Sequence, residues 1–133
     1  MLHQLQKAIV QEYLQSLDAL ELRTVCESIY AGTAPQGKSY PFIVFDALEG
    51  AVIRTICPKD ADVSPIEFKV YARESQRALN IAGRVREFFE NREVTMDDFR
   101  VIRARSTSVG KRYDEIERIY IATVTIEYTT IEQ

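Results

Sequence analysis

Few side chains in this sequence could perform catalysis or bind a metal. The one histidine, His3, lies in a terminal segment that is prone to fray, where a solvated imidazole is expected. The two cysteines, Cys26 and Cys57, belong to no CxxC pair, so we expect buried free thiols and no zinc site. No Gly-rich phosphate loop, GxSxG or HExxH motif is present.

Acidic pairs are the remaining route to an active site, because neighbouring carboxylates can hold Mg²⁺. The pairs are Asp60 with Asp62, Asp97 with Asp98, and Asp114 with Glu115. Each lies in a predicted turn or at a predicted strand end, where aspartate is common for local hydrogen-bonding reasons. We therefore expect solvated turns, no metal, no cofactor and no enzyme.

Basic side chains accumulate in the last third of the chain, and they could contact phosphate groups. They are Arg100, Arg103, Arg105, Lys111, Arg112 and Arg118. Alternation along a strand puts Arg103 and Arg105 on one face, in line with Phe99 and Val101. The nearby acidic residues 114, 115 and 117 would neutralise much of this charge, so cross-strand ion pairing is the expectation. A strip that contacts phosphates is the alternative.

The first half of the chain predicts a helix followed by strands. Apolar residues recur at helical spacing from Leu2 to Leu17, and the helix should end near Asp18, although residues 19–22 could extend it. Residues 25–30 form a short run of alternating side-chain character, which is typical of a strand. Residues 31–38 form a connection, residues 40–46 a strand buried on both faces and residues 51–56 a further strand after a turn. Residues 58–65, bracketed by prolines, predict a loop.

The second half predicts a strand and then a helix. Residues 66–71 alternate strictly, so one face of that strand points inward. Ser75 is a suitable N-cap for a helix that runs to about Glu90. Gly83 in its middle costs stability and often permits close approach to a neighbour, and Asn91 indicates a left-handed C-cap. The expected inner side of this helix consists of Ala78, Leu79, Ala82, Val85, Phe88 and Phe89.

A long hairpin closes the chain, with strands over residues 99–107 and 116–131 and a loop over 108–115. The second strand would span about 50 Å, so either a bulge bends it or its beginning projects as an arm. One face of it carries Ile116, Tyr120, Ala122, Val124, Ile126 and Tyr128. Ile119 and Ile121 lie on the other, polar face. They must be covered, either by the helix over 75–90 or by a neighbouring subunit.

Length and charge limit the remaining possibilities. A chain of 133 residues fits one domain, which we place at residues 1–133. The net charge of -3 and the pI near 5.3 argue against a general nucleic-acid binder. No apolar run approaches the ~20 residues of a membrane span, and the start of the chain is unlike a signal peptide. We therefore expect no membrane association and synthesis in a cytoplasm.

Three segments together resemble the small tail-completion, or tail terminator, proteins of long-tailed bacteriophages. They are VCESIYAGTAPQGKSYPFIVF at residues 25–45, IEFKVYAR at 66–73 and ATVTIEY at 122–128. The resemblance implies an α+β fold with a mixed, mostly antiparallel sheet, two helices packed on it and a long C-terminal β-hairpin. It also implies a structural role and no catalytic residue.

The resemblance further implies how such a protein would act. A tail terminator caps the tail tube as a ring, usually a hexamer of itself. Its partners are the tail tube protein and a head-completion or connector protein. DNA is only passing cargo. The location is the tail–neck region of a virion or prophage product assembled in the bacterial host cytoplasm. The alternatives are another head–tail neck or joining protein, or an α+β module that binds a ligand or nucleic acid.

Contacts in such a ring would come from the loops at 32–39 and 58–65 and from the hairpin tip at 106–118. The candidate interface residues in or beside these segments are Lys38, Lys59, Asp60, Asp62, Arg103, Arg105, Lys111, Arg112, Arg118, Ile119 and Ile121.

Overall fold

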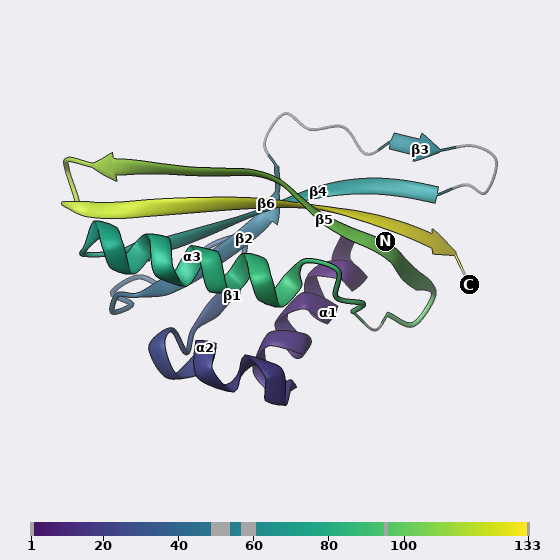
Figure 1. The fold of residues 1–133 in the computed structure, drawn as a ribbon, viewed down its shortest axis with the longest axis horizontal. Helices are drawn as coiled ribbons and strands as arrows, with labels where there is room; N and C mark the ends of the chain where they lie inside the picture. Colours follow the sequence, from purple (N-terminus) through teal and green to yellow (C-terminus); the bar gives the residue numbers. More distant parts are fainter. Residues whose placement is uncertain (1, 49–53, 57–60, 95, 133) are drawn as a thin grey trace.

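The chain folds into one mixed sheet with helices on a single side (Figure 1). The computed structural model describes residues 2–48, 54–56, 61–94 and 96–132. The helical elements are α1 (Leu2–Gln15), the 3-10 turn η1 (Leu17–Ala19), α2 (Leu20–Val25) and α3 (Ser75–Phe89). The strands are β1 (Ile29–Ala31), β2 (Phe42–Ala47), β3 (Arg54–Ile56), β4 (Ala61–Ala72), β5 (Phe99–Asp114) and β6 (Ile119–Glu132). The predicted α+β fold with a long C-terminal hairpin is confirmed.

The sheet is organised around two long neighbouring strands, β4 and β6. The strand order in the described part of the chain is β1-β2-β4-β6-β5, and β3 pairs with β4 beyond the end of β2. The β1–β2 pair is parallel, and the other pairs are antiparallel. β4 and β6 pair continuously from Asp62 opposite Thr130 to Ala72 opposite Tyr120. The sheet is therefore mixed and mostly antiparallel, as expected.

The hydrophobic core lies between the sheet and the helices. Alternate strand residues such as Phe45, Phe68 and Val124 enter one cluster with buried residues of α1 and α3. Aromatic rings connect the layers, because Phe89 of α3 stacks on Phe68 at 4.9 Å between ring centroids and on Tyr13 of α1 at 6.4 Å. We call this side of the sheet the core face and the opposite side, which no described helix covers, the open face (Figure 1).

The predicted loop at residues 58–65 is wrong at its C-terminal end, because β4 already begins at Ala61. Residues 57–60, including Cys57, lie outside the described residues. Pro65 lies inside β4, opposite Glu127 of β6. Its carbonyl accepts the N–H of Leu48 at 3.0 Å, so its nitrogen faces the same flank, between the end of β2 and the start of β3. A proline is tolerated there because the β4–β6 ladder needs no N–H from it.

The hairpin loop is also shorter than predicted. β5 continues to Asp114 and β6 begins at Ile119, so the turn is residues 115–118 and the expected loop at 108–114 is strand. Ile116 therefore belongs to the turn and does not share a face with Tyr120. Two β-bulges, between Val101 and Arg103 and between Ser106 and Ser108, occur in β5, whereas the expected bulge or arm was in the second strand.

The N-terminal helix ends earlier than its apolar spacing predicts. α1 stops at Gln15, and the chain continues through η1 and the short helix α2. Val25 is the last residue of α2, so the short strand predicted from that position begins only at Ile29. Ser16 explains the break, because its side chain accepts the N–H of Asp18 and caps η1. Cys26 is a buried free thiol, as predicted.

Helix α3 differs from its prediction at the N-cap, on one flank and at its glycine. The N-cap is Glu74, without a side-chain hydrogen bond, and Ser75 is the first helical residue. Leu79 is 36% exposed, whereas Ile81 is buried in its place. A Cβ built on Gly83 meets nothing within 4 Å, so the predicted close approach is wrong. Asn91 has the expected left-handed conformation, with φ 60.

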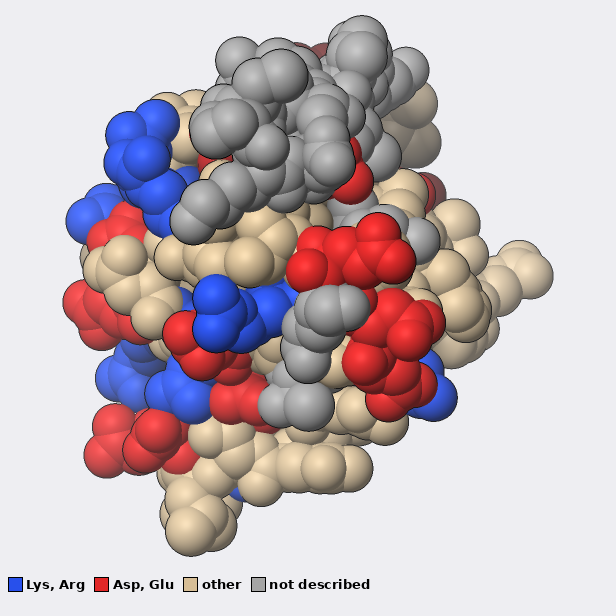
Figure 2. Space-filling view, turned by 90° about the vertical axis from the view of Figure 1, so that its right-hand side faces the viewer, with Lys and Arg blue, Asp and Glu red and all other residues tan. Residues whose placement is uncertain are grey.

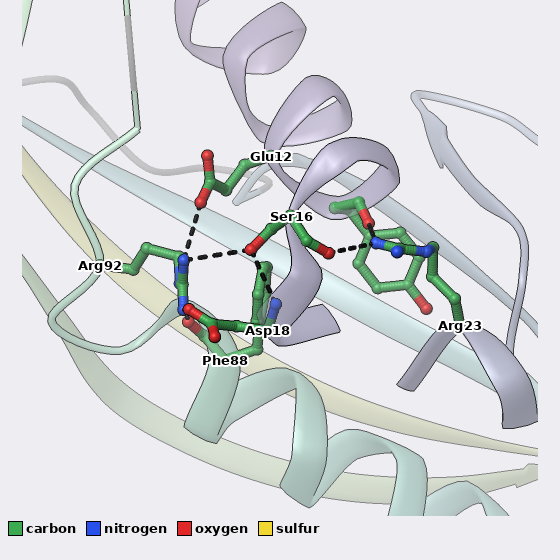
Figure 3. A network of polar contacts seen from close by, with 7 residues as sticks. Glu12, Ser16, Asp18, Arg23, Phe88 and Arg92 are labelled. Atoms are coloured by element: carbon green, nitrogen blue, oxygen red, sulfur yellow. Dashed lines mark hydrogen bonds and ion pairs between the residues drawn. The ribbon is translucent and has the colours of Figure 1, made fainter. Parts of the chain in front are cut away.

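One arginine joins the two helical elements that cover the core. Arg92, just after α3, lies 2.8 Å from Glu12 Oε1 of α1 and 2.8 Å from Asp18 Oδ2 of η1 (Figure 3). Its Nε donates to the carbonyl of Phe88 at 2.9 Å, and its guanidinium lies 4.2 Å from the centre of that ring. Burial lowers the pKa of Arg92, but the bonds to both carboxylates outweigh this effect and raise it. Arg92 thus fixes α1 against α3.

Replacing Gly83 with alanine is expected to raise the free energy of unfolding by about 0.5–1 kcal/mol, because Ala is a better helix former and the site is open. Urea unfolding of the G83A variant measures this. G110A is the matched control: its Cβ would lie 2.9 Å from Thr123 Oγ1, so it should bring no gain. A loss of stability in G83A would contradict the open surroundings of this glycine.

Replacing Arg92 with alanine is expected to lower the free energy of unfolding by about 1–3 kcal/mol, because several charge-assisted hydrogen bonds disappear together. Asp18→Ala should cost much less, since that carboxylate side chain is 73% exposed. Chemical denaturation of both variants gives the comparison. Equal losses would mean that the packing between the helices does not depend on Arg92.

Candidate assembly surfaces

The hairpin turn is an ordered projection with an apolar side chain at its tip. Asp114 Oδ1 accepts the N–H groups of Ile116 at 3.0 Å and Glu117 at 3.1 Å. Arg118 completes the turn with φ 57. Ile116 is 92% exposed, the most exposed of the large hydrophobic side chains described. The tip of the hairpin is therefore an ordered turn that presents one apolar side chain to solvent.

Ile119 and Ile121, which the sequence nominated for an interface, are each 2% exposed in the single chain. They lie on the open face, outside the cluster that α3 covers. The cross-strand neighbours of Ile121 are Tyr71 and Arg112, whose long side chains flank it. Both isoleucines are therefore buried in the single chain without α3 over them and without a neighbouring subunit.

The basic residues near the tip have different surroundings. Lys111 lies on the core face, where its Nζ donates to Ser75 Oγ at 2.9 Å and lies 5.9 Å from the ring centre of Tyr120. Arg112 is exposed on the open face, and Arg118 is exposed in the turn. Lys111 therefore helps hold the hairpin against α3, whereas Arg112 and Arg118 are available to a partner.

The 32–39 loop adjoins an aromatic cluster that the sequence did not reveal. Phe42 stacks on Tyr71 at 4.9 Å and on Tyr40 at 5.3 Å, and Tyr30 meets it edge-on at 6.3 Å. Lys38 lies 6.0 Å from the centre of the Tyr30 ring. These rings come from β1, β2 and β4 and the approach to β2, so the pairings of β2 with β1 and with β4 bring them together.

Beside these rings the open face has a hollow of about 330 Å³. It is lined by Gly32, Val44, Phe45, Asp46, Ala47, Glu67, Lys69 and Tyr71. Both charge signs occur in it, and it is open to solvent. Within the described residues, no group of three or more His, Cys, Asp or Glu side chains could hold a metal ion.

The candidates at the start of β4 are only partly described. Lys59 and Asp60 lie outside the described residues. Asp62 is half-buried and pairs across the strands with Thr55 of β3 and Thr130 of β6. It belongs to the sheet and not to the predicted loop.

Arg103 and Arg105 share one face, as predicted, but it is not the face of Phe99 and Val101. The bulge between Val101 and Arg103 inserts Ile102 and reverses the alternation. Val101 and Ala104 enter the core, whereas both arginines are exposed on the open face. The acidic residues expected to neutralise them lie at the hairpin turn, at the far end of β5.

A second exposed apolar surface lies at the corner formed by α1, η1 and α2. Leu14 is 50% exposed, Leu17 84% and Leu20 58%. Helical spacing assigned Leu17 to a buried stripe, and the break at Ser16 turns it outward. The only signal in the sequence was Ser16-Leu17-Asp18, a capping pattern inside an apolar repeat.

Charge is mixed on the end of the molecule that lies on the right in Figure 1. Figure 2 shows this end, where acidic side chains extend over both halves of the view and basic ones lie mainly on its left.

No described helix is long and apolar enough to cross a membrane.

Comparisons with known proteins point to one family. The family model described as tail completion protein gp17 matches residues 11–131. Among solved structures, a chain from the virion of a native gene transfer agent (GTA) particle has a TM-score of 0.75 and 13% identity, over 98% of this chain and 96% of that chain. Identity this low shows a shared fold alone. No curated protein matches the chain.

Replacing Asp114 with alanine is expected to loosen the hairpin turn, because two turn N–H groups lose their acceptor. The cost to stability should be about 1 kcal/mol, with faster hydrogen exchange at Ile116 and Glu117. Asp114→Asn retains an acceptor oxygen and serves as the control. Unchanged exchange at both amides in D114A would show that the turn does not depend on this carboxylate.

Proposed function

This chain belongs to the tail completion protein gp17 family, and on that basis we propose that it completes a phage tail by capping the tail tube as a ring. In this proposal the ring, a hexamer, ends growth of the tube and accepts the head connector. The protein is then a structural part of the virion at its tail–neck region, assembled in the bacterial host cytoplasm, with DNA as passing cargo. The virion origin of the similar solved chain supports this placement.

The observation that carries the proposal is a pair of unlike apolar projections on one chain. Ile116 is exposed at the hairpin turn, and Leu17 is exposed at the helical corner, on a different part of the molecule. A contact that joins unlike surfaces is heterologous, and copies related in this way form rings when the rotation closes. We propose that the hairpin turn contacts the neighbouring copy.

Tail completion then follows from geometry without chemistry. A ring whose one side fits the last layer of the tube occupies the site where another tube subunit would bind. In this proposal its other side is a different surface of the chain, which rejects tube subunits and accepts the connector. No bond is made or broken, in keeping with a family of structural tail proteins.

The leading alternative is another head–tail joining protein. Such a protein would bind the connector but would not stop polymerisation of the tube. Adding the purified chain to growing tail tubes separates the two roles, because only a terminator fixes the tube length. A module that binds nucleic acid is the other alternative, and the arginines of β5 give it a specific basis.

The ring is expected to appear in solution or on the ends of tail tubes. Light scattering after gel filtration should give about 92 kDa, six times the 15.3 kDa of one chain, and electron microscopy should show a ring. Ile116→Gln should weaken the oligomer without lowering monomer stability by more than about 0.5 kcal/mol, because this side chain is solvated.

Leu79→Gln, on α3 and away from the turn, is the control and should leave the oligomer intact. A chain that stays monomeric at high concentration and also fails to bind tail tubes would contradict the ring. A ring that forms equally well with Ile116→Gln would exclude the hairpin turn from the contact and leave the ring itself standing.

A further inference from the structure

Three arginines of β5 form a straight row on the open face. Arg100, Arg103 and Arg105 lie opposite Ile131, Thr129 and Glu127, which are successive open-face positions of β6. Steps of two residues along β6 space the arginines about 7 Å apart. In a regular strand, where side chains alternate between the two faces, Arg100 and Arg103 would lie on opposite faces. The bulge at Ile102 brings them onto the same face.

The row is exposed and unpaired. All three side chains are exposed, and none forms a hydrogen bond or ion pair within the described part of the chain. By contrast, Arg23 and Arg92 on the helical side have partners: Arg23 Nη1 donates to the carbonyls of Tyr13 and Ser16, and Arg92 binds two carboxylates. The arginines of the row therefore have their donors free for a partner.

The acidic residues at the hairpin turn lie too far from the row to neutralise it. Asp114 lies opposite Ile119, eight residues of β6 away from the position opposite Arg105, which is about 27 Å along the strand. Glu127, across from Arg105, is the one carboxylate that lies directly opposite a member of the row. Arg112 adds a further exposed positive charge to the same face toward the tip.

We propose that this arginine row contacts the phosphate backbone of double-stranded DNA. Guanidinium groups carry a permanent charge and a planar set of donors that fits phosphate, and a row of them needs no base contacts. The net charge of -3 keeps the contact weak and local, which suits DNA that must move past the protein. The proposal rests on the proposed function, because a ring on a tail places one of its faces along the path of the DNA.

The test measures binding of a fluorescently labelled DNA duplex to the full chain by anisotropy, at several salt concentrations. The natural chain should bind weakly at low salt and release the DNA as salt rises. R100Q/R103Q/R105Q should bind at least tenfold less tightly, and the slope of log affinity against log salt should be shallower by about 2–3. R77Q/R84Q/R86Q on α3 removes the same charge from the other side of the molecule and should bind DNA like the natural chain.

Each outcome decides the proposal. Equal losses in both triple variants would overturn it, because binding would then follow net charge and not the row. No binding by the natural chain at low salt would also overturn it. If the row then binds polyglutamate, its partner is an acidic protein surface. Circular dichroism and oligomer mass, measured for every variant, separate these results from misfolding and from failure of the ring.

Discussion

The continuous antiparallel pairing of β4 with β6 is the constraint on which the rest of this structure depends. It runs from Asp62 opposite Thr130 to Ala72 opposite Tyr120, and among the described strands β2, β3 and β5 pair directly with one of these two strands, whereas β1 joins through β2. A one-residue slip of either strand against the other would move that strand's core residue, Phe68 of β4 or Val124 of β6, to the open face. The register of this pair therefore decides which side chains α3 covers and which remain for other molecules.

All described helices lie on one side of the sheet, so none of them covers its open face. On that face Ile119 and Ile121 are buried without a described helix over them, and Phe42 stacks on both Tyr40 and Tyr71. An antiparallel sheet can keep such a half-exposed face because its backbone groups are already paired. The same one-sidedness explains why candidate contact surfaces appear on the open face, at the hairpin turn and at the helical corner, and not in a deep pocket.

The two bulges in β5 connect local strand geometry to function. In a regular strand Val101, Arg103 and Arg105 would share one face, so either the two arginines would point into the core or Val101 would point away from it, and a buried unpaired arginine is costly. Inserting Ile102 keeps Val101 and Ala104 inside and the arginines outside. The bulges also interrupt the free edge of β5 and so make uncontrolled edge-to-edge pairing less favourable.

Local patterns in the sequence were sufficient for the helix over 75–89, the buried strand at 42–45 and the left-handed Asn91, whereas the arrangement of the sheet came from the family resemblance. These features depend on period and backbone preference, which neighbouring residues determine. Sequence patterns failed where a distant partner decides the outcome. β6 extends β5 through the predicted loop at 108–114, and the flank between β2 and β3 lets Pro65 lie within β4. For the candidate surfaces, residue type alone indicated positive charge at 103 and 105. Only the tertiary pairing determined that these arginines align with Arg100, remain unpaired and face away from the helices.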